Sequence, residues 1–222
     1  MKRFLHFLLS FALLAEACAA GAPMKIGSQR ELFVDEHLVA SMEGVKLVMH
    51  TPEPQEVALV CDEPWEGNTS AYYTLFKDGD IYRVYYRGSH YDEATKKGTH
   101  PLTTCYAESR DGVRWVKPKL GIVEFNGSKE NNIIRIGDGC SNFTPFKDTN
   151  PKCPPEARYK ALSSAGDEVE RKKKPALQAH QSADGLHWSL IREEPVITAG
   201  SFDSQNTSFY DAERGEYRAY WR

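Results

Sequence analysis

One short motif occurs twice in the chain and limits the folds open to it. Residues 109–115 read S-R-D-G-V-R-W and residues 182–188 read S-A-D-G-L-H-W, so both fit the form S-x-D-G-x-x-W. Their surroundings also correspond, because F-K-D stands ahead of each copy, at 76–78 and 146–148. A third start reads F-Y-D at 209–211. Self-similarity of this kind indicates a repeat architecture.

Each repeat is expected to consist of short antiparallel strands. Aromatic and β-branched runs separated by turn residues are typical of strands. In the first repeat such runs cover 72–76, 81–87, 102–109 and 114–117. An Asp-Gly turn favours a tight hairpin, because Gly accepts a positive φ and the Asp side chain caps nearby backbone donors. The sequence therefore predicts a four-stranded unit, with the tryptophan of the motif packed between neighbouring sheets.

A four-stranded sheet repeated around an axis is a β-propeller, so the chain is predicted to be all-β. A β-sandwich with coincidentally similar hairpins is the alternative. The blades are expected at about 61–130, 131–198 and 199–222, the last incomplete, with N-terminal strands within 21–60 leading into them. The two motif copies begin 73 residues apart, so five such blades need about 365 residues. We therefore expect a five-bladed propeller truncated to about two and a half blades.

The first 20 residues have the layout of a secretory signal peptide. Lys2 and Arg3 precede an apolar run from Phe4 to Leu14, and small residues follow it. The run is too short for a membrane span, which needs about 20 apolar residues. A lipoprotein anchored through Cys18 is a less favoured alternative. We therefore expect a secreted or periplasmic protein without a membrane span.

Charge and cysteine content narrow the classes of partner and cofactor. The formal net charge of -3 is small and both signs are scattered, which argues against a nucleic-acid partner. Four cysteines remain after the leader, and free thiols or one or two disulfides are both compatible with an oxidising compartment. No C-x-x-C spacing indicates zinc. No cofactor is expected, and no calcium-binding loop is visible, although a structural calcium is compatible with the fold.

Several short motifs together resemble a known group of proteins. They are E-L-F-V-D at 31–35, P-W-E-G at 64–67, Y-Y-R-G at 85–88, N-F-T-P-F at 142–146, F-D-S-Q-N at 202–206 and the two S-x-D-G-x-x-W copies. The chain resembles exported bacterial proteins related to the five-bladed propellers of glycoside hydrolase families 32 and 43. This resemblance implies a funnel at the propeller axis with carboxylates from successive blades. The W-x-N-D-P and R-D-P stretches of family 32 are absent.

Glycoside cleavage needs at least two carboxyl groups, one of them protonated. Glu66 and Asp203 are the candidate catalytic residues, because both precede a first strand of a blade. Asp62 is a further candidate, and Asp138 lies between two glycines and reads more readily as a turn residue. The second blade has Cys140 at the offset of Asp203, so the three-carboxylate set does not carry over.

Candidate sugar-binding residues surround these carboxylates. Aromatic rings stack on sugars, arginine binds carboxylate or sulfate, and amides bind hydroxyls. The residues expected to line the site are Arg87, Tyr86, His90, Gln205, Asn206 and Asn142. The sequence predicts an exported glycoside hydrolase-like protein acting on a poly- or oligosaccharide, inactive as this fragment. The alternatives are a non-catalytic carbohydrate-binding propeller and a chain that does not fold by itself.

Overall fold

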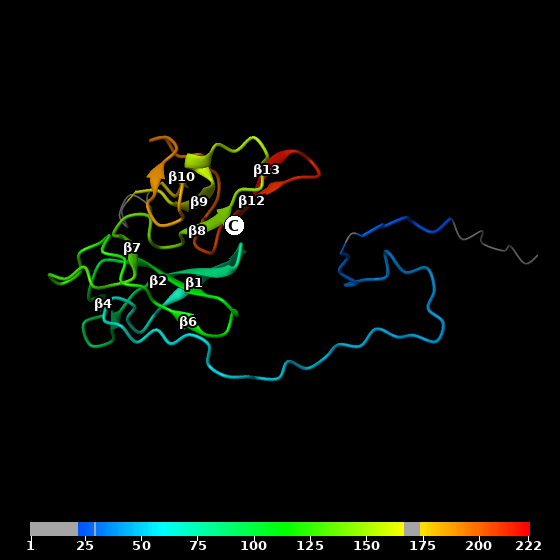
Figure 1. The fold of residues 1–222 in the computed structure, drawn as a ribbon, viewed down its shortest axis with the longest axis horizontal. Coiled ribbons are helices and arrows are strands. Elements are labelled where there is room, and N and C mark those ends of the chain that lie inside the picture. The colour runs from blue at the N-terminus through cyan, green and yellow to red at the C-terminus, as the bar shows by residue number, and fades with distance from the viewer. Residues whose placement is uncertain (1–21, 29, 167–173) are drawn as a thin grey trace, which may run out of the picture. The chain divides into compact units, whose positions relative to one another are not determined.

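The computed structural model describes residues 22–28, 30–166 and 174–222, and within them the chain is built almost entirely from antiparallel strands (Figure 1). The described part contains one helical turn, the 3-10 helix η1 (Pro155–Ala157). The chain divides into two units, Met1–Pro54 and Gln55–Arg222. The signal peptide expected at 1–20 lies outside the described residues. No helix among the described residues is long and apolar enough to cross a membrane.

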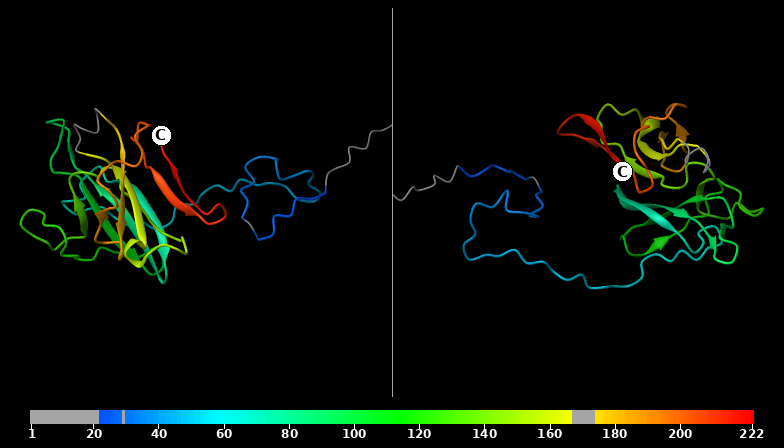
Figure 2. Two further views of the ribbon diagram at one scale, coloured as in Figure 1. Left: turned by 90° about the horizontal axis from the view of Figure 1, so that it is seen from above. Right: turned by 180° about the vertical axis from the view of Figure 1, so that it is seen from behind.

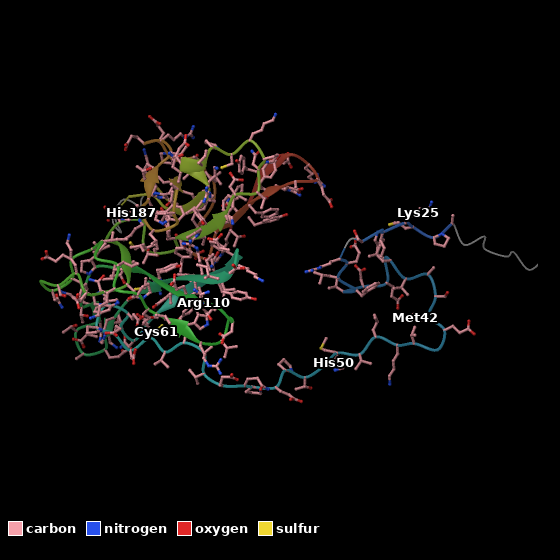
Figure 3. All side chains as sticks on the ribbon, in the orientation of Figure 1. Lys25, Met42, His50, Cys61, Arg110 and His187 are labelled. Carbon is pink, nitrogen blue, oxygen red and sulfur yellow. The ribbon has the colours of Figure 1, made fainter. Side chains whose placement is uncertain are left out.

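The N-terminal unit has no strand in its described part. Its side chains are mostly exposed, and Figure 3 shows Lys25, Met42 and His50 along a chain that is not folded into a sheet. Residues 55–70 also contain no strand. A strand is stable only when a neighbour takes up its backbone N–H and C=O groups. The N-terminal strands expected within 21–60 are therefore not formed in the described residues.

The first sheet contains the four strands that the sequence predicted, in consecutive antiparallel order. These are β1 (Ala71–Asp78), β2 (Ile81–Gly88), β5 (Thr103–Ser109) and β6 (Trp115–Val116). Two features are additional. The β3 (Tyr91–Asp92) and β4 (Lys97–Gly98) hairpin is inserted after β2, and β7 (Ile133–Ile136) pairs with the half of β5 that β6 leaves open.

The second sheet repeats this order and a third unit begins it again. The second sheet consists of β8 (Thr144–Lys147), β9 (Tyr159–Ser164), β10 (Leu177–Ser182) and β11 (Ser189–Leu190). The third consists of the hairpin β12 (Thr207–Asp211) and β13 (Glu216–Tyr220). The first strand of the second unit, β8, contacts both β1 and β12, and two further views show the sheets from other sides (Figure 2). The described sheets form an open series and not a closed ring.

The S-x-D-G-x-x-W motif makes the same turn in both complete units. The Asp184 carboxylate accepts hydrogen bonds from the backbone N–H of Leu186 (2.8 Å) and His187 (2.9 Å), and Asp111 does the same one unit earlier. Gly185 has a φ of +80°, which favours glycine. The indole N–H of Trp188 donates to the Gly185 carbonyl (2.9 Å). The motif therefore forms its turn from its own residues, independently in each unit.

The second motif also joins two sheets. Trp188 packs edge-on against Phe143 of its own unit and Tyr85 of the first, with ring centroids 5.0 Å and 6.5 Å away. The Tyr85 hydroxyl donates to the Gly185 carbonyl (3.1 Å). A Cβ at Gly185 would lie 2.7 Å from that hydroxyl oxygen, so only glycine permits this approach. The expected packing of the tryptophan between neighbouring sheets is confirmed for Trp188.

A carboxylate at the end of β1 holds the first and second units together. Asp78 accepts hydrogen bonds from Arg83 of its own unit and from Lys147 and Tyr159 of the second, each over 2.6 Å. Its side chain is 8 % exposed. Burial opposes ionisation of Asp78, but the hydrogen bonds from Lys147 and Tyr159 and the charge of Arg83 outweigh it and lower its pKa.

The same joint recurs between the second and third units. Asp148, directly after β8, accepts hydrogen bonds from Lys160 of its own unit and from Tyr217 of the third (2.7 Å for Tyr217). Strand register makes Lys160 the counterpart of Arg83, and Tyr217 the counterpart of Tyr159. Each joint thus consists of an acid ending a first strand, a base beside it and a tyrosine from the next unit.

We predict that Asp78→Asn destabilises the protein by about 2–3 kcal/mol, because it leaves Arg83 and Lys147 without their countercharge. Since the folded-state pKa of Asp78 is lowered, its contribution is complete above the usual aspartate pKa of 3.8 and is lost as the pH falls further. Urea unfolding at pH 7 and pH 3 measures both effects. The exposed turn residue Asp80 provides the control, and Asp80→Asn should change stability by less than about 0.5 kcal/mol. Equal losses of stability in the two variants would show that Asp78 does not stabilise the contact between the first and second units.

Candidate functional site

Two hollows lie beside the segments that lead into β8 and β12. The larger is a cavity of about 710 Å³, lined by the end of β2 with the following loop, the β3–β4 hairpin with residues 100–102, residues 137–139, Ser141 and Gly166. The smaller, about 390 Å³, is lined by Ser141, Ser164, Pro175 and residues 200–203. Both hollows include Ser141, and we call them together the rim site. Of the sequence-predicted residues, Arg87, His90 and Asp203 line it, as does Asp138.

The larger cavity has a basic lining. Arg87, Lys96 and Lys97 line it, against the single carboxylate of Asp138. Lys96 also forms an exposed ion pair with Glu93 at 2.7 Å. The excess of positive charge attracts anionic groups.

One histidine of this cavity has an unused nitrogen. The Nδ1 of His100 lies 2.7 Å from the Pro101 carbonyl, which makes Nδ1 the donor. Its Nε2 is buried and has no hydrogen-bond partner among the described residues. Buried polar atoms in native proteins are nearly always bonded. An unbonded ring nitrogen in a cavity wall is therefore suited to a ligand or a water molecule.

Arg87 is held in place by the residues that enter β1. Its guanidinium lies over the Tyr72 ring, 4.7 Å from the centroid, and donates to the Thr69 carbonyl (3.3 Å). The Tyr72 hydroxyl donates to the Asp203 carbonyl (3.1 Å), which links the first and third units. Tyr72 and Phe202 both have positive φ, at +58° and +55°. Left-handed backbone at bulky residues is strained, and such strain clusters at binding and catalytic sites.

The segment 202–206 presents Asp203 and uses its amides for support. Arg222 donates to both carboxylate oxygens of Asp203, over 3.0 Å and 2.9 Å, and the Asp203 side chain remains 55 % exposed. The side chain of Asn142 is buried and donates to the carbonyls of Phe202 (2.7 Å) and Ser204 (2.9 Å). Its oxygen accepts from the N–H and hydroxyl of Ser164. Asn142 therefore supports the backbone of the segment on both sides of Asp203.

The other two amides of this region are also engaged. Asn206 is fully buried and donates to the Ser204 carbonyl (2.9 Å). Gln205 donates to the hydroxyl of Thr74 (2.7 Å) and the carbonyl of Tyr73 (3.0 Å) in β1. The sequence predicted these amides as sugar-binding groups. In the structure they position the backbone around Asp203.

Glu66 lies inside the first unit and not on the rim site. It is 0 % exposed, and both of its oxygens accept hydrogen bonds. One accepts from the hydroxyl of Tyr86, and the other from Lys117 (2.7 Å) and the backbone N–H of Glu63 (2.9 Å). Lys117 also reaches the exposed Asp62 at 3.1 Å. Glu66 is thus a saturated buried carboxylate with a paired cation.

Tyr86 continues this network and is not exposed for stacking on a ligand. Its ring is 1 % exposed, and its hydroxyl accepts from Asn132 (2.9 Å) while donating to Glu66. Asn132 in turn accepts from the indole N–H of Trp65 (2.6 Å). Burial raises the pKa of Tyr86, so that its hydroxyl remains a donor. The P-W-E-G and Y-Y-R-G motifs therefore meet in one hydrogen-bonded core.

A polar cluster that the sequence did not predict joins β7 of the first sheet to the second sheet. Arg135 donates to the His180 Nδ1 (2.8 Å) and to the Asp138 carbonyl (3.3 Å), which supports the 137–141 segment of the rim site. Because Nδ1 accepts, His180 carries its proton on Nε2 and donates to Ser163 (2.8 Å). Burial, with Arg135 nearby, lowers the pKa of His180 to about 3. The Ser163–His180 pair is not arranged for nucleophilic catalysis, because the histidine nitrogen that faces the hydroxyl donates a proton and does not accept one. No sequence motif predicted this cluster.

The four cysteines of the described residues are free thiols. Cys105 and Cys140 are buried, and Cys61 and Cys153 are half-buried. Of the two readings that the sequence left open, the structure has free thiols. Within the described ranges, no group of three or more His, Cys, Asp or Glu side chains is placed to hold a metal ion.

No protein-family model and no curated protein sequence matches the chain. Among solved structures, a fructofuranosidase from Schwanniomyces occidentalis complexed with fructosylnystose has a TM-score of 0.43 at 16% identity, over 74% of this chain and 33% of that one. An N-acetylgalactosamine deacetylase from F. plautii, complexed with blood group B trisaccharide, has a TM-score of 0.35 at 15% identity, over 63% and 35%. A glycosyl hydrolase from Bacteroides ovatus has a TM-score of 0.35 at 16% identity, over 65% and 39%. The chain spans about a third of the length of the first two.

We predict that Glu66→Gln destabilises the protein by about 3 kcal/mol, because it removes the charge that compensates the half-buried Lys117. Thermal and urea unfolding measure the loss. Asp62 binds the same lysine but is largely exposed, so Asp62→Asn should leave the unfolding midpoint nearly unchanged. A wild-type midpoint in Glu66→Gln would show that the buried pair contributes nothing.

Proposed function

We propose that this is a glycoside hydrolase-like protein of the five-bladed propeller type that binds carbohydrate at the rim site. The observation that carries the proposal is the larger cavity, in which Arg87, His90 and Tyr91 converge beside the entry to a first strand. The sequence resemblance implies a sugar site at this end of the blades. The successive four-stranded units, with β8 between β1 and β12, support the same architecture. We further propose export, directed by residues 1–20.

Binding is favoured over cleavage by the positions of the two candidate carboxylates. Glycosidases place two carboxyl groups on either side of one bond. Glu66 is fully buried and each of its oxygens is already bonded, whereas Asp203 is half-exposed on the rim site. A carboxylate without access to solvent does not reach a sugar. We therefore assign Glu66 a supporting role, and we regard Asp203 as a ligand-facing group.

The basic lining predicts a preference among glycans. Oligosaccharides bearing uronate carboxylates or sulfate esters should bind more tightly than neutral ones of equal length, and the affinity should fall with added salt. Isothermal titration with uronate, sulfated and neutral oligosaccharides tests this. Lys97→Gln should weaken anionic binding about three- to tenfold and leave neutral binding unchanged.

Lys119 provides the matched control, because it is an exposed lysine on a different segment, paired with Glu130. Lys119→Gln should bind like the wild type. If neutral oligosaccharides bind tightly and Lys97→Gln changes nothing, the carbohydrate site is supported but the preference for anionic glycans is rejected. If none of the three oligosaccharide classes binds, the carbohydrate site itself is wrong.

Hydrolysis is the second candidate function, favoured by the exposed Asp203 carboxylate that Arg222 orients. If Asp203 is catalytic, Asp203→Asn should lower the rate of glycan cleavage at least about a hundredfold while binding persists. Release of reducing ends, followed beside binding, measures both. We expect binding without release from the wild-type chain. Release that Asp203→Asn abolishes would establish the second candidate instead.

A further inference from the structure

Cys153 lies directly against a lysine amine in the second unit. It belongs to the loop between β8 and β9, and Lys160 is the second residue of β9. The helical turn η1 lies between them, and the Lys160 amine donates to the Cys153 sulfur over 3.1 Å. The thiol in turn donates to the Ala157 carbonyl, also over 3.1 Å. The sulfur and the amine nitrogen are therefore already in contact.

The Lys160 amine is held in this place by its other hydrogen bonds. Besides the sulfur, it donates to the carboxylate of Asp148 and to the Ala157 carbonyl (3.0 Å). A lysine ammonium has three N–H donors, so these three acceptors match its capacity. The Lys160 side chain is 17 % exposed and the Asp148 side chain is fully buried. The amine therefore has little freedom to leave the sulfur.

The sulfur is also open to a small reagent. Cys153 is half-buried and lines a hollow of about 310 Å³ together with Lys147 and Arg158. None of the residues that line this hollow lines the rim site. Burial and the neighbouring Asp148 raise the pKa of the Cys153 thiol, against the opposing effect of Lys160. The thiol is therefore protonated at neutral pH and reacts as the thiolate in alkaline solution.

The residues that follow Cys153 close one route that is open to an oxidised cysteine. A sulfenic acid, Cys–SOH, condenses with a thiol, or with a backbone nitrogen to a sulfenamide, which has an S–N bond. The next two residues are Pro154 and Pro155, and a proline nitrogen has no hydrogen to give up. The nitrogen in contact with the sulfur is instead the Lys160 amine.

We propose that Cys153 and Lys160 are a redox modification site, at which a peroxide converts the contact into a sulfenamide crosslink. The Cys153 thiolate attacks one peroxide oxygen, so that an S–O bond forms, the O–O bond breaks and hydroxide leaves. The Lys160 ammonium protonates this hydroxide to water and becomes an amine. The amine then attacks the sulfur, the S–N bond forms, and the S–O bond breaks as a second water leaves with an amine hydrogen. The sulfur loses two electrons and the peroxide gains them.

The crosslink acts on the joint between the second and third units. Lys160 is the base beside Asp148 in that joint, and Tyr217 is the donor from the third unit. A sulfenamide nitrogen carries no positive charge. After oxidation, Asp148 therefore keeps the Tyr217 hydroxyl and the backbone N–H of Asn150 as donors but has lost the positive charge of Lys160.

The experiment treats the whole chain with hydrogen peroxide at pH 9, where part of the thiol is ionised, and follows the intact mass. We expect a product lighter by two hydrogen atoms, which dithiothreitol returns to the starting mass. Trypsin should then release the peptide Cys153–Arg158 joined to the peptide that begins at Tyr159. This pair of peptides distinguishes the crosslink from a disulfide between two cysteines.

Variants separate the roles of the two residues. Cys153→Ser should lose the crosslink. Lys160→Arg keeps the positive charge beside Asp148, but a guanidinium is not deprotonated in proteins and does not attack the sulfur. In Lys160→Arg the crosslink should fall at least about tenfold, and dimedone should label the sulfenic acid at Cys153 instead.

Lys152→Arg is the matched control, because Lys152 adjoins Cys153 in the sequence but is exposed. It should form the crosslink like the wild type, and circular dichroism verifies that each variant is folded. The proposal is overturned if Cys153 only gains oxygen, if the crosslink persists in Lys160→Arg, or if the joined peptides contain an additional oxygen, which would indicate an N–O–S linkage.

Discussion

The fold depends on a carboxylate placed where each first strand ends. Asp78 is almost completely buried, yet it is charged, because a base from its own unit and a lysine and a tyrosine from the next surround it. Burying a charge is costly unless partners are fixed around it. That requirement sets the spacing of successive units, and Asp148 repeats it with Lys160 and Tyr217. Units joined in this way bring the entries of β1, β8 and β12 to the same end.

The rim site depends on polar groups that do not themselves face a ligand. Asn142 fixes the carbonyls on either side of Asp203, and Arg135 fixes the carbonyl of Asp138. Each support is hydrogen-bonded from within the fold, which places the exposed groups with little freedom of movement. Stability and ligand contact are thus assigned to different residues. Glu66 and Tyr86 stabilise the first unit, whereas Arg87, one residue further along β2, lines the cavity.

Local patterns predicted most of the strands, because each strand and turn is encoded by its own residues. The motif turns at Asp111 and Asp184 need only their own Gly, Ser and backbone donors. β7 was missed because Ile133–Ile136 pairs only with the part of β5 that β6 leaves open, a tertiary circumstance. The strands expected within 21–60 failed for the complementary reason, since a suitable sequence forms a strand only beside a partner.

By itself, the sequence determined the repeat and the antiparallel order of strands within each unit, since these follow from turns and spacing along the chain. Only the tertiary structure decided which polar groups are exposed. Glu66 and Asp203 both precede a first strand in the sequence, but Glu66 is buried and paired with Lys117, 51 residues away, while Asp203, bound by Arg222, stays open to solvent. Burial depends on which other segments pack against a side chain. The sequence does not show, for example, that Tyr86 is buried while the adjacent Arg87 lines a cavity.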